Sequence, residues 1–525
     1  MLKQRTTTFY RTGLKFIQGH YPLILSVLIL IIAGVMTFTL QNNVVGFEPG
    51  YDALAPKHHG SVSSKGLAII TQATAENHFV GYAIRYKDDQ GTIIYDYFDR
   101  YPVFFSAAFN RILALRPKLS SKIYLAKQVM NVIFVATLIV AFLLCDKLIK
   151  NKLLSLTAVL IAFANPYLMF YKDMVHFDQP ALFGFLLLTY AIALYKIDGL
   201  KYPMVIATFI AIALGRGYAS YAVLGLWLVI EAFLILKRGG LSLGQKVRDI
   251  VRHPAFILMV IAIVWGGSLL SYNILIEAKT RNISPLQTSI LDSAGRRLSL
   301  NQAFNQENAD IINWGDYLKT ETGRIIKWSF PIKYSDPGFL VNLAVLGLMA
   351  LAIGLATRRQ TPEKRIIFIL LALSGFAWMI PMRNMAAFHD YTTMYFIGFT
   401  LAFFVSLLTL LRPSRDAAVY LALMAMVVYL GALGQVKDLH ESIAGNASAY
   451  TYDFMRIESV IGSQGNNVYI DGTIPYGTNA PEFYLPDQYL APLSLADYVI
   501  SYNAAYLPDN LTPQNSVMFL FKKPK

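Results

Sequence analysis

Long apolar runs separated by short polar connections recur along most of this 525-residue chain. Each run is roughly 17 to 22 residues long, the length that a helix needs to cross about 30 Å of hydrocarbon. The composition agrees, because 55% of the residues are hydrophobic and only 15% are charged, whereas soluble domains carry about 25% charged residues. The runs predict a polytopic α-helical membrane protein.

The apolar runs and the charges beside them predict the topology. With the N-terminus in the cytoplasm, the inner segments carry twenty Lys and Arg residues, and the three short outer connections carry only Lys172, Arg216 and Arg383. This is the asymmetry that the positive-inside rule describes. It requires the short fifth helix, because without it the basic loop TRRQTPEKR would lie outside. We expect about eleven transmembrane helices, at approximately residues 21–40, 123–145, 153–171, 180–196, 202–215, 218–236, 255–275, 339–356, 366–381, 393–411 and 416–434.

The charge distribution also predicts location and partners. Much of the net charge of +14 lies in the inner connections, which fits a membrane topology rather than nucleic-acid binding. We expect a multi-pass protein of the cell (inner) membrane, with a cytoplasmic N-terminus and an extracytoplasmic C-terminal domain. The lipid bilayer is therefore an expected partner, and nucleic acid is not.

Three longer segments on the outer side divide the chain into two predicted domains. Residues 1–434 form a transmembrane module with outer loops at 41–121 and 277–339, and residues 435–525 form a small extracytoplasmic α/β domain. In the first loop, FVGYAIRYKDDQGTIIYDYF alternates on both sides of DDQG and predicts a β-hairpin. In the second loop, INWGDYLKTETGRIIKWSF predicts an amphipathic helix on the membrane surface. In the tail, NNVYIDGT, ADYVISY and SVMFLFKK predict short strands.

Titratable side chains gather in the three short outer connections. Such groups near a bilayer are candidates for function, because each one costs free energy unless it is paired or hydrated. On the outer side of the membrane we expect them to reach water. The candidates are Asp173, His176 and Asp178 in FYKDMVHFDQPALF, Arg216 in LGRGYA, and Arg383, His389 and Tyr391 in MRNMAAFHDYTTMY.

Carboxylates and cations together at one membrane surface suit a polyprenyl-phosphate sugar. Arg can bind the phosphate through two hydrogen bonds, and a carboxylate can deprotonate an acceptor hydroxyl for attack on the anomeric carbon. The sequence has no Walker-type or dinucleotide-binding Gly-rich motif, so a soluble nucleotide donor has no support. No cofactor is firmly implied. The adjacent His58 and His59 could bind a divalent metal with Asp52 or Glu48, but they lack a recognised ligand spacing.

Several stretches resemble the GT-C superfamily of membrane glycosyltransferases, in the branch that contains protein O-mannosyltransferases and the bacterial lipid A aminoarabinose transferase. HFDQPALFGFLLLTYAIALY is similar to that family's acidic residue followed by Pro and an apolar span. YDYFDRYPVFFSAAFNRILAL resembles an aromatic-rich segment before its second span, and LGRGYASYAVLGLWLVI resembles a basic-Gly segment. The ending LADYVISYNAAYLPDNLTPQNSVMFLFKK resembles the outer C-terminal domain of many bacterial members. The likeness follows the order of most of the chain.

The resemblance implies roles for individual residues. It makes Asp178 a catalytic-site acid and gives Arg216 a phosphate-facing position. The family has an acidic pair soon after its first span, whereas APKHHGSV places His58 and His59 at that point here. Asp52, just upstream, is then the expected general base, with His59 close by. His59 could itself be the base, because the pKa of an unperturbed imidazole, about 6.5, suits the task.

Plainer interpretations stay open for most of these residues. Asp178 could cap the helix that follows it, and Asp173 could be a solvated loop charge. His176 either packs or contacts the substrate. Arg216 could form a structural ion pair instead of binding phosphate, and Arg100 in YDYFDRYP could pair with a carboxylate or reach a phosphate.

The leading hypothesis is an inverting hexosyl- or pentosyltransferase that uses a polyprenyl-phosphate-linked sugar on the extracytoplasmic face, with a lipid, glycan or protein acceptor. Asp52 would act as base, Asp178 would position a substrate, and Arg216 with Arg383 would neutralise the leaving phosphate. The alternative is a transporter or flippase of a lipid-linked or anionic solute, which would favour charges near the midplane and repeated halves. A scaffold that presents the tail to partners ranks last, because it leaves the interfacial Arg and Asp residues without a role.

Overall fold

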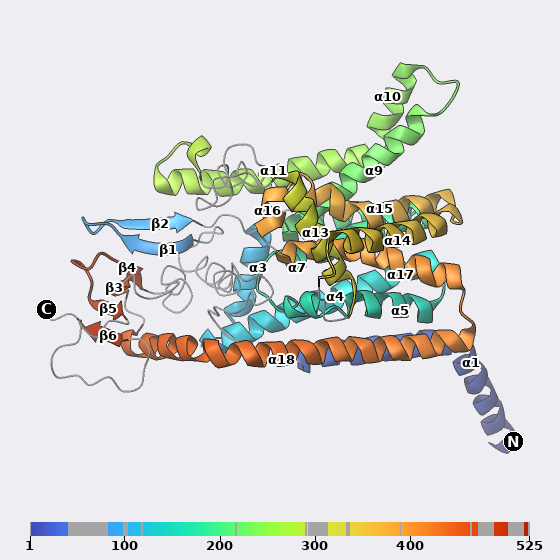
Figure 1. The fold of residues 1–525 in the computed structure, drawn as a ribbon, viewed down its shortest axis with the longest axis horizontal. Coiled ribbons are helices and arrows are strands. Elements are labelled where there is room, and N and C mark those ends of the chain that lie inside the picture. The colour runs from blue at the N-terminus through green and yellow to red at the C-terminus, as the bar shows by residue number, and fades with distance from the viewer. Residues whose placement is uncertain are drawn as a thin grey trace.

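Long helices, most of them running side by side, dominate the computed structural model of the chain (Figure 1). It describes residues 2–39, 82–97, 103–116, 119–215, 218–288, 291, 313–331, 336–388, 390–462, 465–470, 488–501 and 519–522. The helices of the first half are α1 (Leu2–Thr39), α3 (Val103–Leu113), α4 (Leu119–Ile149), α5 (Lys152–Phe163), α6 (Pro166–Phe170), α7 (Asp178–Asp198), α8 (Tyr202–Gly215), α9 (Tyr218–Leu236), α10 (Leu243–Arg252) and α11 (Pro254–Arg281). Those of the second half are η1 (Pro285–Gln287), α13 (Trp314–Ser329), α14 (Phe339–Arg358), α15 (Pro362–Met379), α16 (Arg383–Phe388), η2 (Asp390–Phe396), α17 (Ile397–Leu411) and α18 (Arg415–Ile461).

A helix occupies every predicted transmembrane position. Within the described residues, eight helices are long and apolar enough to cross a membrane: α1, α4, α7, α9, α11, α14, α17 together with the end of η2, and α18. The chain is therefore a polytopic α-helical membrane protein, as predicted. α5 and α8 are apolar but shorter, and α15 begins with the charged Glu363, Lys364 and Arg365. The number of transmembrane helices, eleven, stays a prediction.

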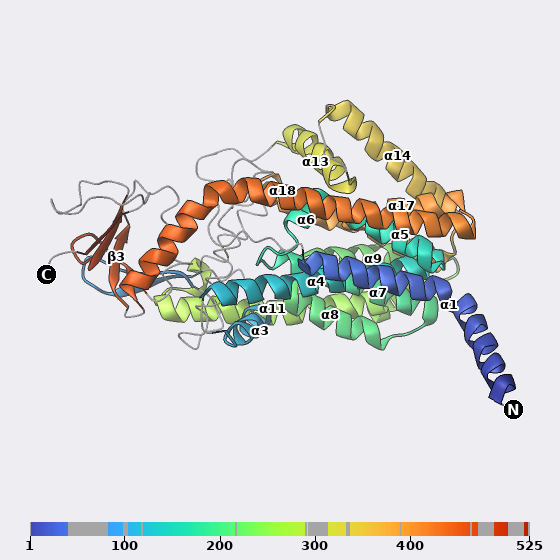
Figure 2. The same ribbon diagram turned by 90° about the horizontal axis from the view of Figure 1, so that it is seen from below.

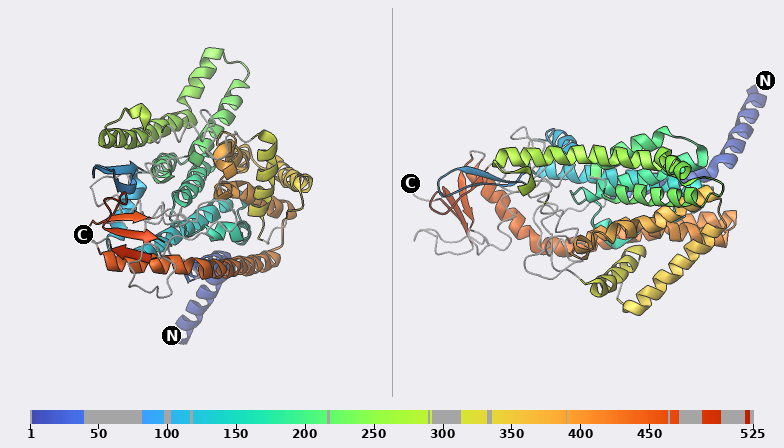
Figure 3. Two further views of the ribbon diagram at one scale, coloured as in Figure 1. Left: turned by 60° about the vertical axis from the view of Figure 1, so that its left-hand side comes forward. Right: turned by 90° about the horizontal axis from the view of Figure 1, so that it is seen from above.

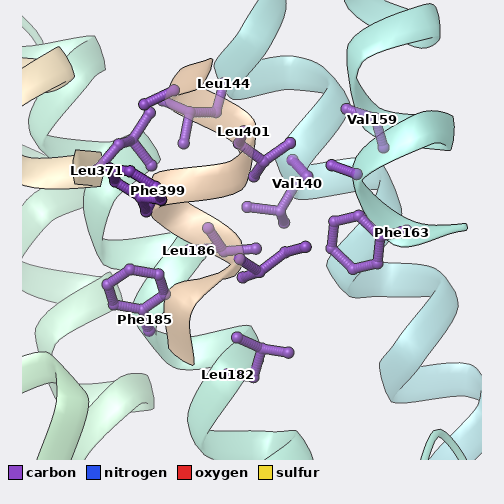
Figure 4. Packing of buried hydrophobic residues seen from close by; sticks show 14 of the residues in the cluster. Val140, Leu144, Val159, Phe163, Leu182, Phe185, Leu186, Leu371, Phe399 and Leu401 are labelled. Atoms are coloured by element: carbon purple, nitrogen blue, oxygen red, sulfur yellow. The ribbon is translucent and has the colours of Figure 1, made fainter. Parts of the chain in front are cut away.

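α7 lies at the centre of the bundle and packs against α4, α8, α9 and α15. Phe185 and Leu186 of α7 meet Leu401 of α17 and Val140 of α4 in a continuous apolar core (Figure 4). Leu186 and Leu401 are fully buried. This burial on several sides explains why the α7 sequence is apolar around most of its circumference rather than along one stripe.

Small residues let α7 and α8 approach closely. A Cβ atom added to Gly215 would lie 2.5 Å from the Cα of Ala181, and one added to Gly184 would lie 2.8 Å from the Cα of Ala211. Glycine and alanine at facing positions allow two helix backbones to pack at short range inside a membrane. The contact near Ala181 holds the first turn of α7, which begins at Asp178.

A mixed β-sheet lies beyond one end of the bundle, far from the N-terminus (Figures 1 and 2). In the described residues it has six strands in the order β2-β1-β4-β3-β5-β6. The predicted hairpin of the first outer loop is confirmed, because β1 and β2 pair antiparallel. The predicted tail strands are confirmed as β3, β5 and β6. The strands are β1 (Tyr82–Lys87), β2 (Ile93–Tyr97), β3 (Asn467–Ile470), β4 (Tyr489–Leu490), β5 (Tyr498–Ser501) and β6 (Phe519–Lys522).

The sheet joins the first outer loop to the tail. β1 pairs parallel with β4 through Tyr86 and Leu490, so strands that are distant in sequence share one sheet. α18 leads to this sheet as one helix from Arg415 to Ile461. The pairing places the first outer loop and the tail together at the same end of the bundle.

The predicted amphipathic helix of the second outer loop is confirmed as α13, on one flank of the bundle beside α14 (Figure 3). Its apolar side, which we expected against lipid, packs instead against α14, α16, α17 and η2. The hydroxyl of Tyr317 donates to the carbonyl of Met379 over 3.0 Å, and Trp328 is buried. α13 therefore packs on the elements that carry the third outer connection.

Candidate active site

Hydrogen bonds fix the short helix α6, which leads into the connection to α7. Asn165 starts the short helix α6 by accepting hydrogen bonds from the backbone N–H groups of Tyr167 and Leu168, and Pro166 occupies its first turn. The amide of Asn165 also donates to the backbone carbonyls of Lys327 and Phe330 over 2.8 and 2.9 Å. Asn165 therefore both caps α6 and fastens it to the end of α13.

Asp178, the residue that the sequence singled out, lies at the start of α7 and is 1% exposed. Its Oδ1 atom accepts a hydrogen bond from the Tyr395 hydroxyl over 2.8 Å. Its Oδ2 atom lies in close contact with Nδ1 of His176, which is 5% exposed. In the described chain, the N-cap of α7 is Phe177 and no side chain caps the helix. The capping interpretation of Asp178 is therefore wrong, because its carboxylate is held by Tyr395 and His176 instead.

Tyr395 belongs to the third outer connection, on η2. It is fully buried, and its ring lies 4.9 Å from that of Trp378. The sequence pointed to His389 and Tyr391 in this segment and missed Tyr395. MRNMAAFHDYTTMYF contains two tyrosines four residues apart, and no local signal distinguishes the one that contacts Asp178.

Lys172 and Asp173 form a second polar group in the same connection. Lys172 is 1% exposed, and its ammonium donates to the Thr37 carbonyl over 3.1 Å and to Oδ1 of Asn131 over 2.9 Å. Oδ2 of Asp173 lies 4.0 Å from the same ammonium. Burial lowers the pKa of Lys172, and the Asp173 carboxylate opposes that shift. Because Thr37 also bonds Tyr429 over 2.7 Å, this group ties the outer connection to α1, α4 and α18.

The three predicted candidates Asp173, His176 and Asp178 are buried, contrary to the expectation that they reach water. Asp173 is 0% exposed, so its interpretation as a solvated loop charge is wrong. The side chains of the connection turn inward, where buried partners rather than water stabilise them. A position in a connection between two helices did not make these residues solvent-exposed, because η2 packs against α6 and α7, and α13 is bonded to Asn165 at the start of α6.

Arg383, a predicted phosphate ligand, begins α16 and is half-buried. Its guanidinium lies 4.6 Å from the ring centre of Trp314, in a cation–π contact with α13. Nearby, Arg324 donates to the carbonyls of Ala386 and Ala387 over 2.7 and 2.9 Å, which fixes the end of α16. Arg383 therefore lies next to α13, on the same connection that contains Tyr395.

The other predicted site residues are not among those that the structure describes. Tyr391 lies in η2, but its side chain is not among those described. No three His, Cys, Asp or Glu side chains among the described residues are arranged to hold a metal ion. The predicted residues outside the described part of the chain are Asp52, His59, Arg100, Arg216 and His389.

The geometry suits a carboxylate that orients a substrate hydroxyl. Tyr395 and His176 hold the two oxygens of Asp178, so the carboxylate keeps one orientation without a water shell. Inside a protein such hydrogen bonds are stronger than in water, and a preorganised carboxylate needs little reorganisation when charge develops next to it.

Comparison with known proteins gives a match in fold and none in sequence. No family model matches the chain, and no curated protein sequence matches it. ArnT from Cupriavidus metallidurans, solved bound to undecaprenyl phosphate, matches with a TM-score of 0.54 and 12% identity over 90% of this chain and 86% of that one. The apo form of that protein matches with a TM-score of 0.53 and 13% identity, over 89% and 85%.

An oligosaccharyltransferase from Archaeoglobus fulgidus, tethered with an acceptor peptide, aligns over 94% of this chain and 70% of its own, with 10% identity and a TM-score of 0.47. ArnT, the lipid A aminoarabinose transferase, is a GT-C glycosyltransferase, and it aligns along most of both chains. The chain described here therefore has the GT-C fold, which was predicted from its sequence.

Proposed function

We propose that this protein is an inverting membrane glycosyltransferase that moves a sugar from a polyprenyl-phosphate donor to an acceptor at the outer face. The observation that carries the proposal is the buried Asp178 carboxylate, held by Tyr395 and His176 at the head of a central helix of a GT-C fold. Burial of a carboxylate costs free energy, so a buried carboxylate near a membrane is a candidate functional group. In this fold we infer that Asp178 orients a hydroxyl of the sugar or of the acceptor.

The proposed reaction is a displacement at the anomeric carbon. An acceptor hydroxyl oxygen forms the new bond, the bond from that carbon to the phosphate oxygen breaks, and the electron pair leaves with the polyprenyl phosphate. Asp52, or His59 in its place, takes the hydroxyl proton. Asp178 orients the reacting hydroxyl, and His176 holds Asp178 and contacts the substrate.

Cations supply the other half of the proposed site. Arg216 binds the leaving phosphate, assisted by Arg383 and Arg100, since a guanidinium can donate two parallel hydrogen bonds to it. His389 and Tyr391 contact the substrate from the third outer connection. The contact of Tyr395 with Asp178 supports this role for the connection, because Tyr395 belongs to the same short segment of chain as His389 and Tyr391.

The donor class is proposed from the fold and from the position of the site. The ArnT structure contains undecaprenyl phosphate, and eight helices of the described chain are long and apolar enough to cross a membrane, which supports a site close to lipid. A donor that carries its own lipid tail suits a site at the head of such a helix. We propose a pentose or hexose as the sugar, and a lipid, glycan or protein as the acceptor.

We also propose the topology and domain division predicted from the sequence. The N-terminus is cytoplasmic, residues 1–434 form the transmembrane module, and residues 435–525 form the extracytoplasmic part. The apolar portion of α18 ends at Val436, which supports a boundary close to residue 434. Protease protection of sealed, oriented vesicles tests the orientation.

The decisive experiment compares two Asp→Asn changes at opposite ends of α7. The protein is reconstituted in proteoliposomes with a panel of undecaprenyl-phosphate-linked pentoses and hexoses, and the release of undecaprenyl phosphate is measured. Asp178→Asn should lower the transfer rate by about 100-fold, the size of loss that misplacement of a reacting group can cause. The asparagine can still accept the Tyr395 hydrogen bond, so the fold should survive, as thermal unfolding in detergent will show.

The matched control is Asp198→Asn, at the last residue of the same helix. Asp198 pairs with Lys147 over 2.6 Å and is about one-third exposed, so its loss should leave transfer within about twofold, as for a surface ion pair. Full transfer by a folded Asp178→Asn protein would contradict the site assignment. Uptake of an anionic solute by the same vesicles, without sugar transfer, would favour the transporter hypothesis instead.

A further inference from the structure

α10 is an amphipathic helix that the other described parts of the chain leave uncovered. Its apolar residues follow the spacing i, i+4, i+7 and i+8, which puts Leu243, Val247, Ile250 and Val251 on one stripe. Leu243 is 71% exposed, Val247 50% and Val251 47%. α10 lies entirely within the described chain, and none of its residues is buried.

α10 lies between two helices that are long and apolar enough to cross a membrane. The long apolar helix α9 ends at Leu236, and the long apolar helix α11 begins at Pro254. His253 is both the last cap of α10 and the first cap of α11, and its extended backbone (φ −69°, ψ 138°) breaks the helix direction between them. α10 therefore projects from the ends of α9 and α11, away from the rest of the bundle (Figures 1 and 3).

Polar contacts hold α10 in this position. Ser242 and Gln245 form a reciprocal capping box at its start. The ammonium of Lys246 donates to the Leu236 carbonyl over 2.7 Å, so the first turn of α10 also closes the end of α9. At the other end, Nε2 of His253 lies 3.5 Å from the Glu231 carboxylate. α10 is therefore a fixed part of the fold rather than a loose excursion of the chain.

The Glu231 carboxylate is the anchor for the His253 end. It accepts from Lys196 of α7 over 2.7 Å and from the Trp227 indole over 3.0 Å. Glu231 thus links the start of α11 to the central helix of the bundle. The position of α10 depends on the contacts of Glu231 with His253 and Lys196, as well as on the caps of α10 itself.

The charges around α10 match one kind of surface. At about 100° per residue, Lys246 and Arg248 flank the apolar stripe on its two edges, and Arg252 and Gln245 lie on the opposite side. Asp249 is the single acidic residue among these, and Lys237 and Arg238 precede the helix. Basic residues beside an apolar stripe can reach phosphate headgroups while the stripe enters the acyl boundary.

We propose that α10 is an interfacial helix that binds the leaflet at the N-terminal side of the bundle through anionic lipid headgroups. Leu243, Val247, Ile250 and Val251 insert at the boundary between headgroups and acyl chains, and Lys246 and Arg248 bind lipid phosphates. This inference does not depend on the sugar-transfer reaction. It identifies what covers an apolar stripe that would otherwise face water.

The depth of α10 in lipid can be measured on the full chain. Val247→Cys and Gln245→Cys place an environment-sensitive thiol label on opposite sides of the helix, and the native Cys145 is fully buried. The proteins are reconstituted in nanodiscs of phosphatidylcholine and phosphatidylglycerol that contain a spin-labelled quenching lipid. Quenching at position 247 should be at least twofold stronger than at position 245. Equal quenching at both positions, in proteins with equal thermal stability, would overturn the proposal.

The anionic preference has its own matched test. Raising the phosphatidylglycerol fraction should increase the quenching at position 247. Lys246→Gln with Arg248→Gln should remove at least half of that increase, whereas Arg358→Gln with Arg359→Gln, at the end of α14, should leave it unchanged. No response to phosphatidylglycerol in the chain with native arginines, or equal loss in both double variants, would overturn the role of anionic headgroups.

Discussion

The outer connection between α6 and α7 and the α10 connection on the opposite side of the bundle treat charge in opposite ways. In the first, Lys172, Asp173 and Asp178 are each no more than 1% exposed and have protein partners. In the second, the basic residues surround a helix in which no described side chain is buried. The two regions show the two ways in which a membrane protein can keep ionised groups near a bilayer.

The two regions differ because only the first holds charged side chains in fixed orientations. A buried charge needs an exact set of partners, because it loses its hydration. Such a set orients groups well, and the outer connection uses it to hold one carboxylate between a phenol and an imidazole. The basic side chains of an exposed helix have no such fixed orientation, and their charges stay hydrated or bound to lipid phosphate.

The largest expected difference concerns the buried cation. Lys172→Met should lower the free energy of unfolding by about 3–5 kcal/mol, because removal of one partner leaves Asp173 and two acceptor oxygens buried without their donor. Arg248→Met on α10 should change it by no more than about 0.5 kcal/mol. Thermal unfolding in detergent measures both. Equal destabilisation by the two changes would mean that the outer connection is hydrated.

The next prediction concerns the hydrogen bond to Asp178. Tyr395→Phe keeps the ring against Trp378 but removes the hydroxyl that the carboxylate accepts, a loss of about 1.5–3 kcal/mol for a bond to a charged group. The proposed sugar transfer should then slow by roughly 10- to 100-fold. Tyr420→Phe, at a 70% exposed tyrosine of α18, serves as the control and should transfer normally. A Tyr395→Phe protein with normal transfer would show that the orientation of Asp178 does not limit the reaction.

Replacing one glycine by alanine in each region should change the free energy of unfolding by smaller amounts and in opposite directions. Gly215→Ala places a methyl group 2.5 Å from the backbone of Ala181, beside the first turn of α7, and should destabilise the protein by about 1–3 kcal/mol. Gly244→Ala in α10 meets nothing within 4 Å among the described residues. It should stabilise the helix by about 0.5–1 kcal/mol. A drop in melting temperature for both variants would mean that α10 is packed against protein.

The smallest expected effect depends on pH. Burial lowers the pKa of His253 below its usual 6.5, and the Glu231 carboxylate opposes the shift. As the pH falls through about 6.5, the unfolded chain takes up this proton before the folded chain does, so stability should decrease. The melting temperature should therefore fall by a few degrees between pH 7 and pH 5.5, and His253→Asn, which keeps a helix-capping side chain, should remove most of that decrease. An unchanged pH profile in the variant would assign the effect to other groups.

Local patterns in the sequence were enough for most secondary structure. A transmembrane helix can be recognised from the apolar residues of its own segment. The hairpin can be recognised from the alternation of apolar and polar residues on both sides of DDQG. The helix over Trp314–Ser329 was predicted for the same reason. Its environment was not, because the side of an amphipathic helix that is apolar does not reveal whether lipid or protein covers it.

The candidate site was only half visible in the sequence. Asp178 and His176 stand two residues apart, and an acid before a Pro-containing apolar run drew attention to them. Tyr395, whose hydroxyl binds Asp178, lies 217 residues further along the chain, and Lys172 is held by Thr37 and Asn131 from two other helices. Such pairings depend on how helices pack, which no residue spacing within one segment encodes.

The sequence by itself determined that this chain is a polytopic helical membrane protein, where its helices lie and which connections between them hold its titratable groups. These properties follow from the transfer free energy of consecutive residues, which is a local quantity. The tertiary structure alone decided that the outer connection is buried, that Tyr395 rather than a neighbouring residue holds Asp178, and that the first loop and the tail share one sheet. These outcomes required contacts between distant segments, because a buried charge or an unpaired strand edge is stabilised only by the partner that packing brings to it.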